Sequence, residues 1–230
     1  AASTSSGTWT AAVVDTFTGG ATRAARLSVS PNDDVGLTYI TNTAAGVLKF
    51  MYCPATCSNP ASFVPMAAAN NVEGAAIANA TVHTGLAWCK LTGASTYYPA
   101  VAYGGTAAYR YAVCQQASLA NCLTAANWTK QNVVATANLV AGDLYLDATA
   151  NGDQPKVVAK NAATTAVTYK MTGGSALCDG AVGAFGVGAT LTTGTMASQY
   201  IRLMKSSNDR FHVVANNGTA SVVYYNSQTN

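Results

Sequence analysis

Residues 26–40 read RLSVSPNDDVGLTYI, two short apolar runs on either side of a tight turn. The turn is predicted at residues 31–34, because Asn and Asp tolerate the positive φ that a tight hairpin turn requires. The flanking runs contain Leu, Val, Ile, Thr and Tyr, residue types that suit half-buried strands. This stretch therefore predicts an antiparallel hairpin, and equivalent turns are predicted at residues 150–153 and 207–210.

The hairpin belongs to a unit that occurs four times along the chain. Each unit begins with an aromatic residue, and these residues are Trp9, Phe63, Trp128 and Phe185. An apolar-rich segment begins seventeen residues after each of them, at Arg26, Ala80, Tyr145 and Arg202. A Tyr-rich third strand follows, with Tyr52, Tyr111, Tyr169 and Tyr224 at corresponding places, which favours packing between units. No segment has a useful amphipathic helical period.

The spacing of the aromatic residues predicts a ring. They lie 54, 65 and 57 residues apart, and the path from Phe185 through the C-terminus to Trp9 is another 54 residues. Units of about 40–50 residues or slightly more, with four strands each, are typical of β-propeller blades. We therefore predict an all-β fold, a four-bladed β-propeller of four-stranded antiparallel blades. The alternatives are a β-sandwich and an open repeat array.

The predicted propeller is a single domain of residues 1–230. Its repeat units are roughly 15–68, 69–136, 137–192, and 193–230 together with 1–14. A strand at residues 9–14 is expected to close the last blade. Closure of the ring has a physical reason, because an open array would expose sheet edges that invite aggregation.

The composition favours a neutral, hydrogen-bonding surface. Only 9% of the residues are charged, against about 25% in a typical globular domain. The net charge is +3, and the Lys and Arg residues are scattered, so nothing indicates a nucleic-acid partner or an acidic membrane surface. No apolar stretch approaches the ~20 residues that span a bilayer.

Six cysteines indicate an oxidising compartment. Cys53 and Cys57 follow the third strand of the first unit, and Cys114 and Cys122 occupy the same place in the second unit. Pairs that close short connections at a repeated position predict local disulfides, which persist outside the cytosol. A zinc site is the alternative, although four-cysteine zinc sites usually have tighter paired spacings. A bond between Cys89 and Cys178 is predicted with less support.

A candidate ligand site lies in the second unit, which is the longest. Residues 85–93 are interpreted as an insertion that lengthens its first hairpin and places Trp88 in or near the tip. Trp88 is equally consistent with a residue packed under a loop and with an exposed ligand-stacking residue. We place the site beside this hairpin, because loops carry function more often than the scaffold beneath them.

The candidate ligand residues are those that break the repeat, together with two arginines at one repeat position. The residues beside the second-unit hairpin are Trp88, Lys90, Tyr97, Tyr98 and Tyr103. Arg26 and Arg202 both begin a first strand, so they mark one mouth of the central channel as a competing location.

The order of a Trp, an apolar strand, an Asn/Asp turn and the strands VGLTY (35–39) and LKFMYC (48–53) resembles a known family. It is similar to sialidase-like β-propeller proteins of the secreted bacterial type, with a degenerate Asp-box (BNR-type) repeat. The Asp-box, Ser-x-Asp-x-Gly-x-Thr-Trp, is echoed by residues 30–39 with a different spacing. The resemblance covers nearly the whole chain and implies a propeller, with four units where sialidases usually have six.

Enzymatic activity is not expected. A sialidase needs three arginines, a Tyr activated by a Glu, and an acid/base; the chain has five arginines but Glu73 is its only Glu. A general glycosidase needs two carboxylates facing each other across the bond. The only histidines are His83 and His212, and no Gly-x-Ser-x-Gly elbow occurs. A glycosidase remains the alternative.

No cofactor or metal is expected either. Residues 147–153 vaguely resemble a calcium loop but lack its alternating acids and its distant Glu, so we interpret them as a turn. No Gly-rich phosphate loop follows a strand and opens a helix, so nucleotide binding has no support.

The chain is therefore predicted to be a non-catalytic extracellular binding module or adhesin, secreted or on the cell surface. Twelve Tyr and three Trp on a neutral scaffold suit carbohydrate, because sugar faces stack on aromatic rings while amides and hydroxyls read the hydroxyl groups. The expected partner is a glycan or another cell-envelope ligand. The alternative is a structural tip or spacer of a fibre, forming a homo-oligomer with copies of itself.

Overall fold

The structure is a computed structural model of the 230-residue chain. It describes residues 13–15, 25–41, 46–54, 57, 60–77, 84–91, 93–105, 108–134, 139–149, 152–161, 167–171, 185, 189–192, 201–208, 210–217 and 222–229. Within these ranges the regular structure is antiparallel β-sheet with three short 3-10 helices, and they contain no α-helix. The all-β prediction is confirmed.

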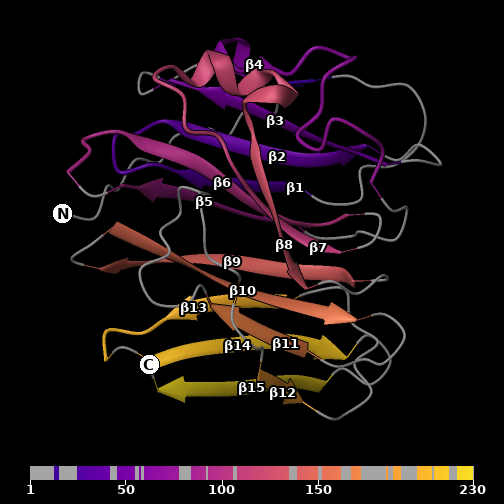
Figure 1. Ribbon diagram of the computed structural model, residues 1–230, viewed down its shortest axis with the longest axis vertical. Coiled ribbons are helices and arrows are strands. Elements are labelled where there is room, and N and C mark those ends of the chain that lie inside the picture. Colours follow the sequence, from indigo (N-terminus) through magenta and orange to yellow (C-terminus); the bar gives the residue numbers. More distant parts are fainter. Residues whose placement is uncertain are drawn as a thin grey trace, which may run out of the picture.

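Four antiparallel sheets follow one another along the chain, and we number them sheets 1 to 4 (Figure 1). Sheet 1 contains β1 (Ala25–Val29), β2 (Val35–Thr41), β3 (Val47–Cys53) and β4 (Val64–Pro65). Sheet 2 contains β5 (Gly85–Lys90), β6 (Tyr97–Gly104), β7 (Tyr109–Val113) and β8 (Thr129–Val134). Sheet 3 contains β9 (Leu139–Thr149), β10 (Gly152–Asn161), β11 (Val167–Met171) and β12 (Ala189–Thr192). Sheet 4 contains β13 (Ile201–Lys205), β14 (Arg210–Asn217) and β15 (Val222–Thr229). The 3-10 helices are η1 (Pro60–Ser62), η2 (Leu119–Leu123) and η3 (Ala125–Asn127).

The four sheets fall within the four predicted repeat units, and each sheet has its strands in chain order. Sheets 1 to 3 have four strands, whereas sheet 4 has three strands among the described residues. Of the predicted closing strand at residues 9–14, residues 9–12 lie outside the described residues. Val13 and Val14 are described and do not belong to a strand, so that part of the prediction is wrong.

The predicted hairpin at residues 26–40 is confirmed, and local hydrogen bonds explain it. Asp33 has a φ of 65°, the left-handed conformation that Asp tolerates better than most residues. The Ser30 hydroxyl accepts hydrogen bonds from the backbone amides of Asn32 (3.1 Å) and Asp34 (3.0 Å). The turn is therefore fixed by its own side chains, with β1 and β2 paired on either side of it.

The second unit corrects the sequence interpretation. Its apolar segment was expected to begin at Ala80, and residues 78–83 lie outside the described residues. The first strand that the structure shows there is β5, which begins at Gly85. Residues 85–90, interpreted as part of an insertion, are thus the first strand itself, and the hairpin connection is residues 91–96.

Three hydrophobic clusters lie between successive sheets. Sheets 1 and 2 share a cluster that includes Phe50 and Trp128, whose rings meet edge to face at 5.4 Å. Sheets 2 and 3 share a second one, in which Tyr111 meets Phe185 at 5.9 Å. A third cluster joins sheets 3 and 4. Two of the unit-initiating aromatics thus pack against the third strand of an earlier sheet, which fits a repeated architecture.

The first strands of the sheets meet near the centre of the molecule. β1 lies against β5, β5 against β9, and β9 against β13. In Figure 1 these strands lie toward the middle, whereas β4, β12 and β15 lie at the top and bottom. The contact between β5 and β9 is very close, because a methyl group on Gly85 would lie only 2.5 Å from the Leu144 nitrogen.

A long connection after β4 covers the outer side of sheet 1. It runs alongside β3. The Met66 amide donates a hydrogen bond to the Phe50 carbonyl (3.1 Å), and the Val72 amide donates to the Leu48 carbonyl (2.8 Å). Between these bonds the chain bows outward, and the Lys49 ammonium donates to the backbone carbonyls of residues 67, 68 and 70. Burial lowers the pKa of Lys49. The carbonyls satisfy a cation that would otherwise be buried without a partner.

Candidate functional site

A groove of about 320 Å³ lies where the ends of sheets 1 and 2 meet. We call it the tyrosine groove. It is lined by Asp34, Tyr52, Pro54, Thr96, Tyr97, Gln116, Ala117, Ser118 and Leu119. These residues come from the first hairpin turns of the two sheets, from strands β3 and β6, and from the segments that follow the third strands. The groove is thus built from equivalent parts of two neighbouring repeat units.

Strand alternation determines which tyrosine faces the groove. Lys90 pairs with Tyr97 and Cys89 pairs with Tyr98 across β5 and β6, and neighbouring residues on a strand point to opposite faces. Tyr98 and Cys89 belong to the cluster shared with sheet 3, whereas Tyr97 faces sheet 1 and lines the groove. The Lys90 ammonium lies 5.6 Å from the centre of the Tyr97 ring, a cation–π contact.

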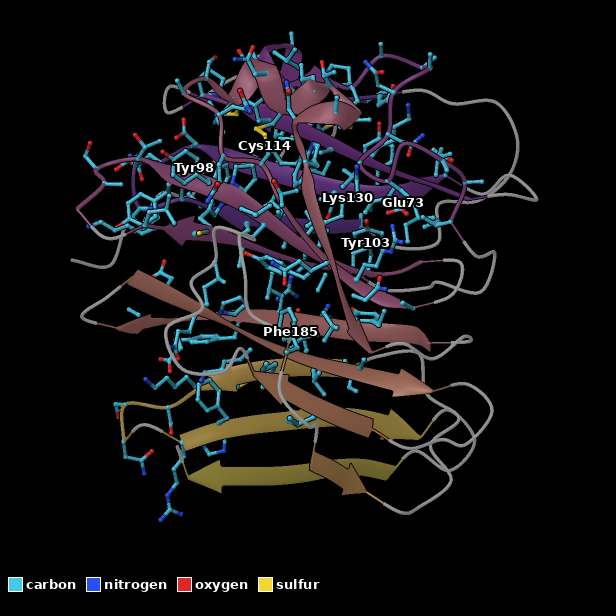
Figure 2. All side chains as sticks on the ribbon, viewed as in Figure 1. Glu73, Tyr98, Tyr103, Cys114, Lys130 and Phe185 are labelled. Carbon is cyan, nitrogen blue, oxygen red and sulfur yellow. A yellow bond between two sulfur atoms is a disulfide. The ribbon has the colours of Figure 1, made fainter. Side chains whose placement is uncertain are left out.

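Two disulfides frame the groove, as the cysteine spacing predicted. Cys53–Cys57 and Cys114–Cys122 both form, with Cα atoms 5.5 and 5.7 Å apart. Figure 2 shows Cys114 beneath the 3-10 helices at the top of the molecule. Cys89 also takes part in a disulfide, while its predicted partner Cys178 lies outside the described residues.

Further hydrogen bonds hold the walls of the groove in place. The Trp128 indole donates to the Cys122 carbonyl at 2.8 Å, and the Ser118 hydroxyl accepts from the Ala120 amide at 3.3 Å at the start of η2. Across the two sheets, the Asn32 amide donates to the Ser95 carbonyl at 3.3 Å. The wall residues are therefore largely pre-arranged, which lowers the entropic cost of binding a ligand.

The lining residues provide aromatic faces and hydrogen-bonding groups side by side. Tyr52 and Tyr97 are half-buried, so parts of their rings remain open to solvent. Asp34 contributes a carboxylate and Gln116 an amide, and hydroxyls come from Thr96 and Ser118. Apolar walls with a few polar anchors are typical of sites for small molecules and sugars.

The other aromatic residues predicted for the ligand site lie elsewhere. Trp88 is in the middle of β5 and only 6% exposed, so its expected place in or near a hairpin tip is wrong. Its ring packs against Gly36 of sheet 1, which has no side chain to displace it. Tyr103 is fully buried. In this structure neither residue offers a surface to a ligand, because core packing between sheets occupies both side chains.

Tyr103 belongs to a partly buried polar cluster with Glu73 and Arg110. Figure 2 labels Tyr103 and Glu73, which lie close together. The Tyr103 hydroxyl and the Arg110 guanidinium donate to different oxygens of the Glu73 carboxylate. Burial raises the pKa of Tyr103 well above its ordinary value, and the neighbouring Glu73 raises it further. The only glutamate of the chain therefore fastens the long connection after β4 to sheet 2.

The positive charges of Arg26 and Arg202 both act on one buried carboxylate, that of Asp143 in β9. Arg26 forms an ion pair with Asp143 at 3.5 Å, and Asp143 accepts hydrogen bonds from the backbone amides of Leu144 and Leu203, each at 3.0 Å. Burial raises the pKa of Asp143, while the arginines and these amides act in the opposite direction. Asp143 thus joins three of the central strands, β1, β9 and β13.

Residues 147–153 are the segment that resembles a calcium loop. Its two aspartates bind lysine side chains or a backbone amide. Asp147 forms ion pairs with Lys205 (2.6 Å) and Lys156 (3.9 Å), and Asp153 accepts from the Lys90 amide at 2.7 Å. In the part of the chain that the structure describes, no group of three or more His, Cys, Asp or Glu could hold a metal ion.

His212 lies in β14, with a ring nitrogen 2.8 Å from the Ser206 hydroxyl. His83 lies outside the described residues, as does Arg23.

No protein-family model matches the chain, and no curated protein matches its sequence. The described residues also include no helix long and apolar enough to cross a membrane.

Sequence reasoning missed most of the groove. Asp34 was assigned to a turn, Tyr52 to packing, and Gln116 was not singled out. One signal was available, because the cysteine pairs occupy the same place in adjacent units and so bring two equivalent loops together. Tyr97 is the one predicted ligand residue that lines the groove.

Proposed function

We propose that this protein is a non-catalytic binding module that recognises carbohydrate at the tyrosine groove. The observation that carries the proposal is the pairing of two half-buried tyrosine rings with a carboxylate, an amide and hydroxyls in one pre-arranged hollow. Sugar rings present apolar C–H faces that stack on aromatics and hydroxyl edges that need hydrogen-bond partners. A volume of about 320 Å³ accommodates one or two sugar residues, within the usual range of small-ligand sites.

We further propose that the four sheets are the blades of a closed propeller of the sialidase-like repeat type. Support comes from the central position of the first strands and from Asp143, which joins β1, β9 and β13. Gly85 brings β5 against the same part of β9. All four first strands therefore converge on residues 143–144, as they do around the axis of a propeller.

An extracellular setting, secreted or at the cell surface, is part of the proposal. Disulfides persist in oxidising compartments, and both local disulfides border the groove. The partner would then be a glycan on a cell envelope or in the surrounding matrix.

A sialidase-like glycosidase is the alternative function. The observation that favours it is the hydrogen bond between Tyr103 and Glu73, because a sialidase uses a Tyr activated by a Glu. A tyrosine nucleophile needs access to substrate and a lowered pKa. Tyr103 is fully buried and its pKa is raised, so this pair better suits a structural role. Arg26 and Arg110 each already pair with a carboxylate.

The test is a glycan array followed by calorimetric titration of the strongest glycan. Tyr97→Ala should weaken binding at least about fivefold, because one stacking contact contributes roughly 1–3 kcal/mol. Tyr98→Ala is the matched control, since it removes the same ring from the next residue, which faces sheet 3. We expect it to change affinity less than about threefold.

The outcomes separate the candidate functions. Affinity that survives both Tyr97→Ala and Gln116→Ala would place binding elsewhere and refute the groove. Hydrolysis of a sialoside or another glycoside, abolished by Glu73→Gln, would support the glycosidase. Concentration-dependent self-association without glycan binding would favour the fibre component.

A further inference from the structure

The charges around the tyrosine groove narrow the class of sugar that it can take, on the premise that the groove binds carbohydrate. We infer that Asp34 makes the groove selective for uncharged sugars and excludes sugars that carry a carboxylate, such as sialic and uronic acids. Among the nine lining residues Asp34 is the only charged one, and no Lys or Arg lines the groove. None of these nine residues offers a cation to a sugar carboxylate.

Asp34 cannot easily turn away from the groove. Its backbone amide donates to the Ser30 hydroxyl at 3.0 Å, and that hydroxyl donates to the Asp34 carboxylate at 3.4 Å. The turn is further closed by the backbone bond from the Ser30 amide to the Asp34 carbonyl at 2.7 Å. The carboxylate is half-buried, and among the described residues it accepts one long hydrogen bond, from the Ser30 hydroxyl to one of its oxygens.

A fixed carboxylate acts differently on neutral and acidic sugars. It is an acceptor only, and each of its oxygens can accept more than one hydrogen bond, so it suits the hydroxyl pairs of a neutral sugar. A second carboxylate in the same half-enclosed space is repelled, because the effective dielectric there is lower than in bulk water. Both anions would also lose water without gaining a partner.

Cationic sugars are disfavoured for a separate reason. The Lys90 ammonium lies 5.6 Å from the centre of the Tyr97 ring, so positive charge already occupies one side of this aromatic wall. A sugar ammonium stacked on Tyr97 would lie near that lysine. Lys90 therefore weakens both the attraction of Asp34 for a cationic sugar and its repulsion of an acidic one. A neutral ligand, which gives up no charge solvation in the groove, is the best match.

The experiment uses matched sugar pairs on the same array. The probes are trigalacturonic acid with its trimethyl ester, 3′-sialyllactose with lactose, and chitotriose with triacetylchitotriose. Wild-type protein should bind the neutral member of the first two pairs at least about tenfold more tightly than the acidic member, a ratio that we call the acidic gap, and it should bind triacetylchitotriose more tightly than chitotriose. The acidic gap should shrink in 0.5 M NaCl because salt screens the repulsion. Asp34→Asn should narrow the acidic gap to less than about threefold.

Asp33→Asn is the matched control, because it changes the net charge equally at an exposed neighbour that does not line the groove. It should leave the acidic gap as in the wild type. Tyr97-dependent binding that is equal or stronger for the acidic members would overturn the inference while the proposed function stands. Tighter Tyr97-dependent binding of chitotriose than of triacetylchitotriose would overturn the choice of a neutral ligand. If no glycan binding depends on Tyr97, the proposed function falls and the inference with it.

Discussion

The replacement Gly85→Ala tests whether the first strands meet at the centre as described. A methyl group on Gly85 would lie 2.5 Å from the Leu144 nitrogen, 2.7 Å from its Cβ and 3.0 Å from the Asp143 carbonyl carbon. Carbon atoms in contact are ordinarily about 3.5–4.0 Å apart, so the overlap is about 1 Å. Two of the three atoms are backbone, which cannot rotate aside. β5 and β9 must therefore separate along a packed interface.

The expected cost follows from this overlap. Overpacking a well-packed core usually costs about 1–3 kcal/mol, and contact with backbone places this case at the upper end. For a chain of this size each kcal/mol lowers the melting temperature by about 2–4 °C, so the variant should melt about 6–12 °C below wild type. The measurement is thermal unfolding by calorimetry, with urea unfolding as a second estimate of the free energy.

Gly46→Ala is the matched control, because Gly46 is also buried but its new methyl group would meet the Ile40 Cγ2 atom at 3.2 Å. That side chain can shift, so we expect a loss below about 1 kcal/mol. Any gain from a less flexible unfolded chain applies to both variants. If Gly85→Ala melts within about 2 °C of Gly46→Ala, the close approach of β5 to β9 is wrong.

Two further predictions concern ring closure and pH. Deleting residues 1–12, which retains the Tyr39–Asp15 hydrogen bond, should lower the melting temperature by more than about 5 °C if the N-terminal segment closes the ring, and an unchanged temperature would argue for an open array. Because burial raises the pKa of Asp143 above its ordinary value of 3.8, the stability that this group contributes is present below pH 3.8 and is lost as the pH rises through the folded-state pKa. Asp143→Asn should therefore gain melting temperature relative to wild type as the pH rises above about 3.8, with exposed Asp33→Asn as the control, and the opposite trend would mean that Arg26 and the backbone amides outweigh burial.

Features that depend on a few neighbouring residues could be predicted from the sequence. The turn at residues 31–34 rests on Asn and Asp beside a Ser that closes the turn. The disulfides Cys53–Cys57 and Cys114–Cys122 join residues only four and eight positions apart. The division into four successive sheets, each with its strands in chain order, likewise follows from the repeated spacing of turns and strands.

The groove could not be predicted in the same way, because it depends on strand register and on contacts between sheets. Tyr97 and Tyr98 are adjacent and chemically identical, and a shift of one residue in β6 would exchange their roles. Trp88 could not be assigned to the core until Gly36 of the neighbouring sheet was known to lie against it. Glu73 likewise finds Tyr103 and Arg110 thirty and thirty-seven residues further along the chain.

The short span of the two local disulfides also bears on how the protein is made. Six cysteines can pair in about 15 different ways, and wrong pairs must be reshuffled slowly. If synthesis delivers the chain directly into an oxidising compartment, Cys53 and Cys57, and then Cys114 and Cys122, become neighbours as soon as their own stretch of chain enters it. Each pair can therefore oxidise before Cys178 is available to compete. The spacing that ties down the two loops thus also reduces the work required of a disulfide isomerase.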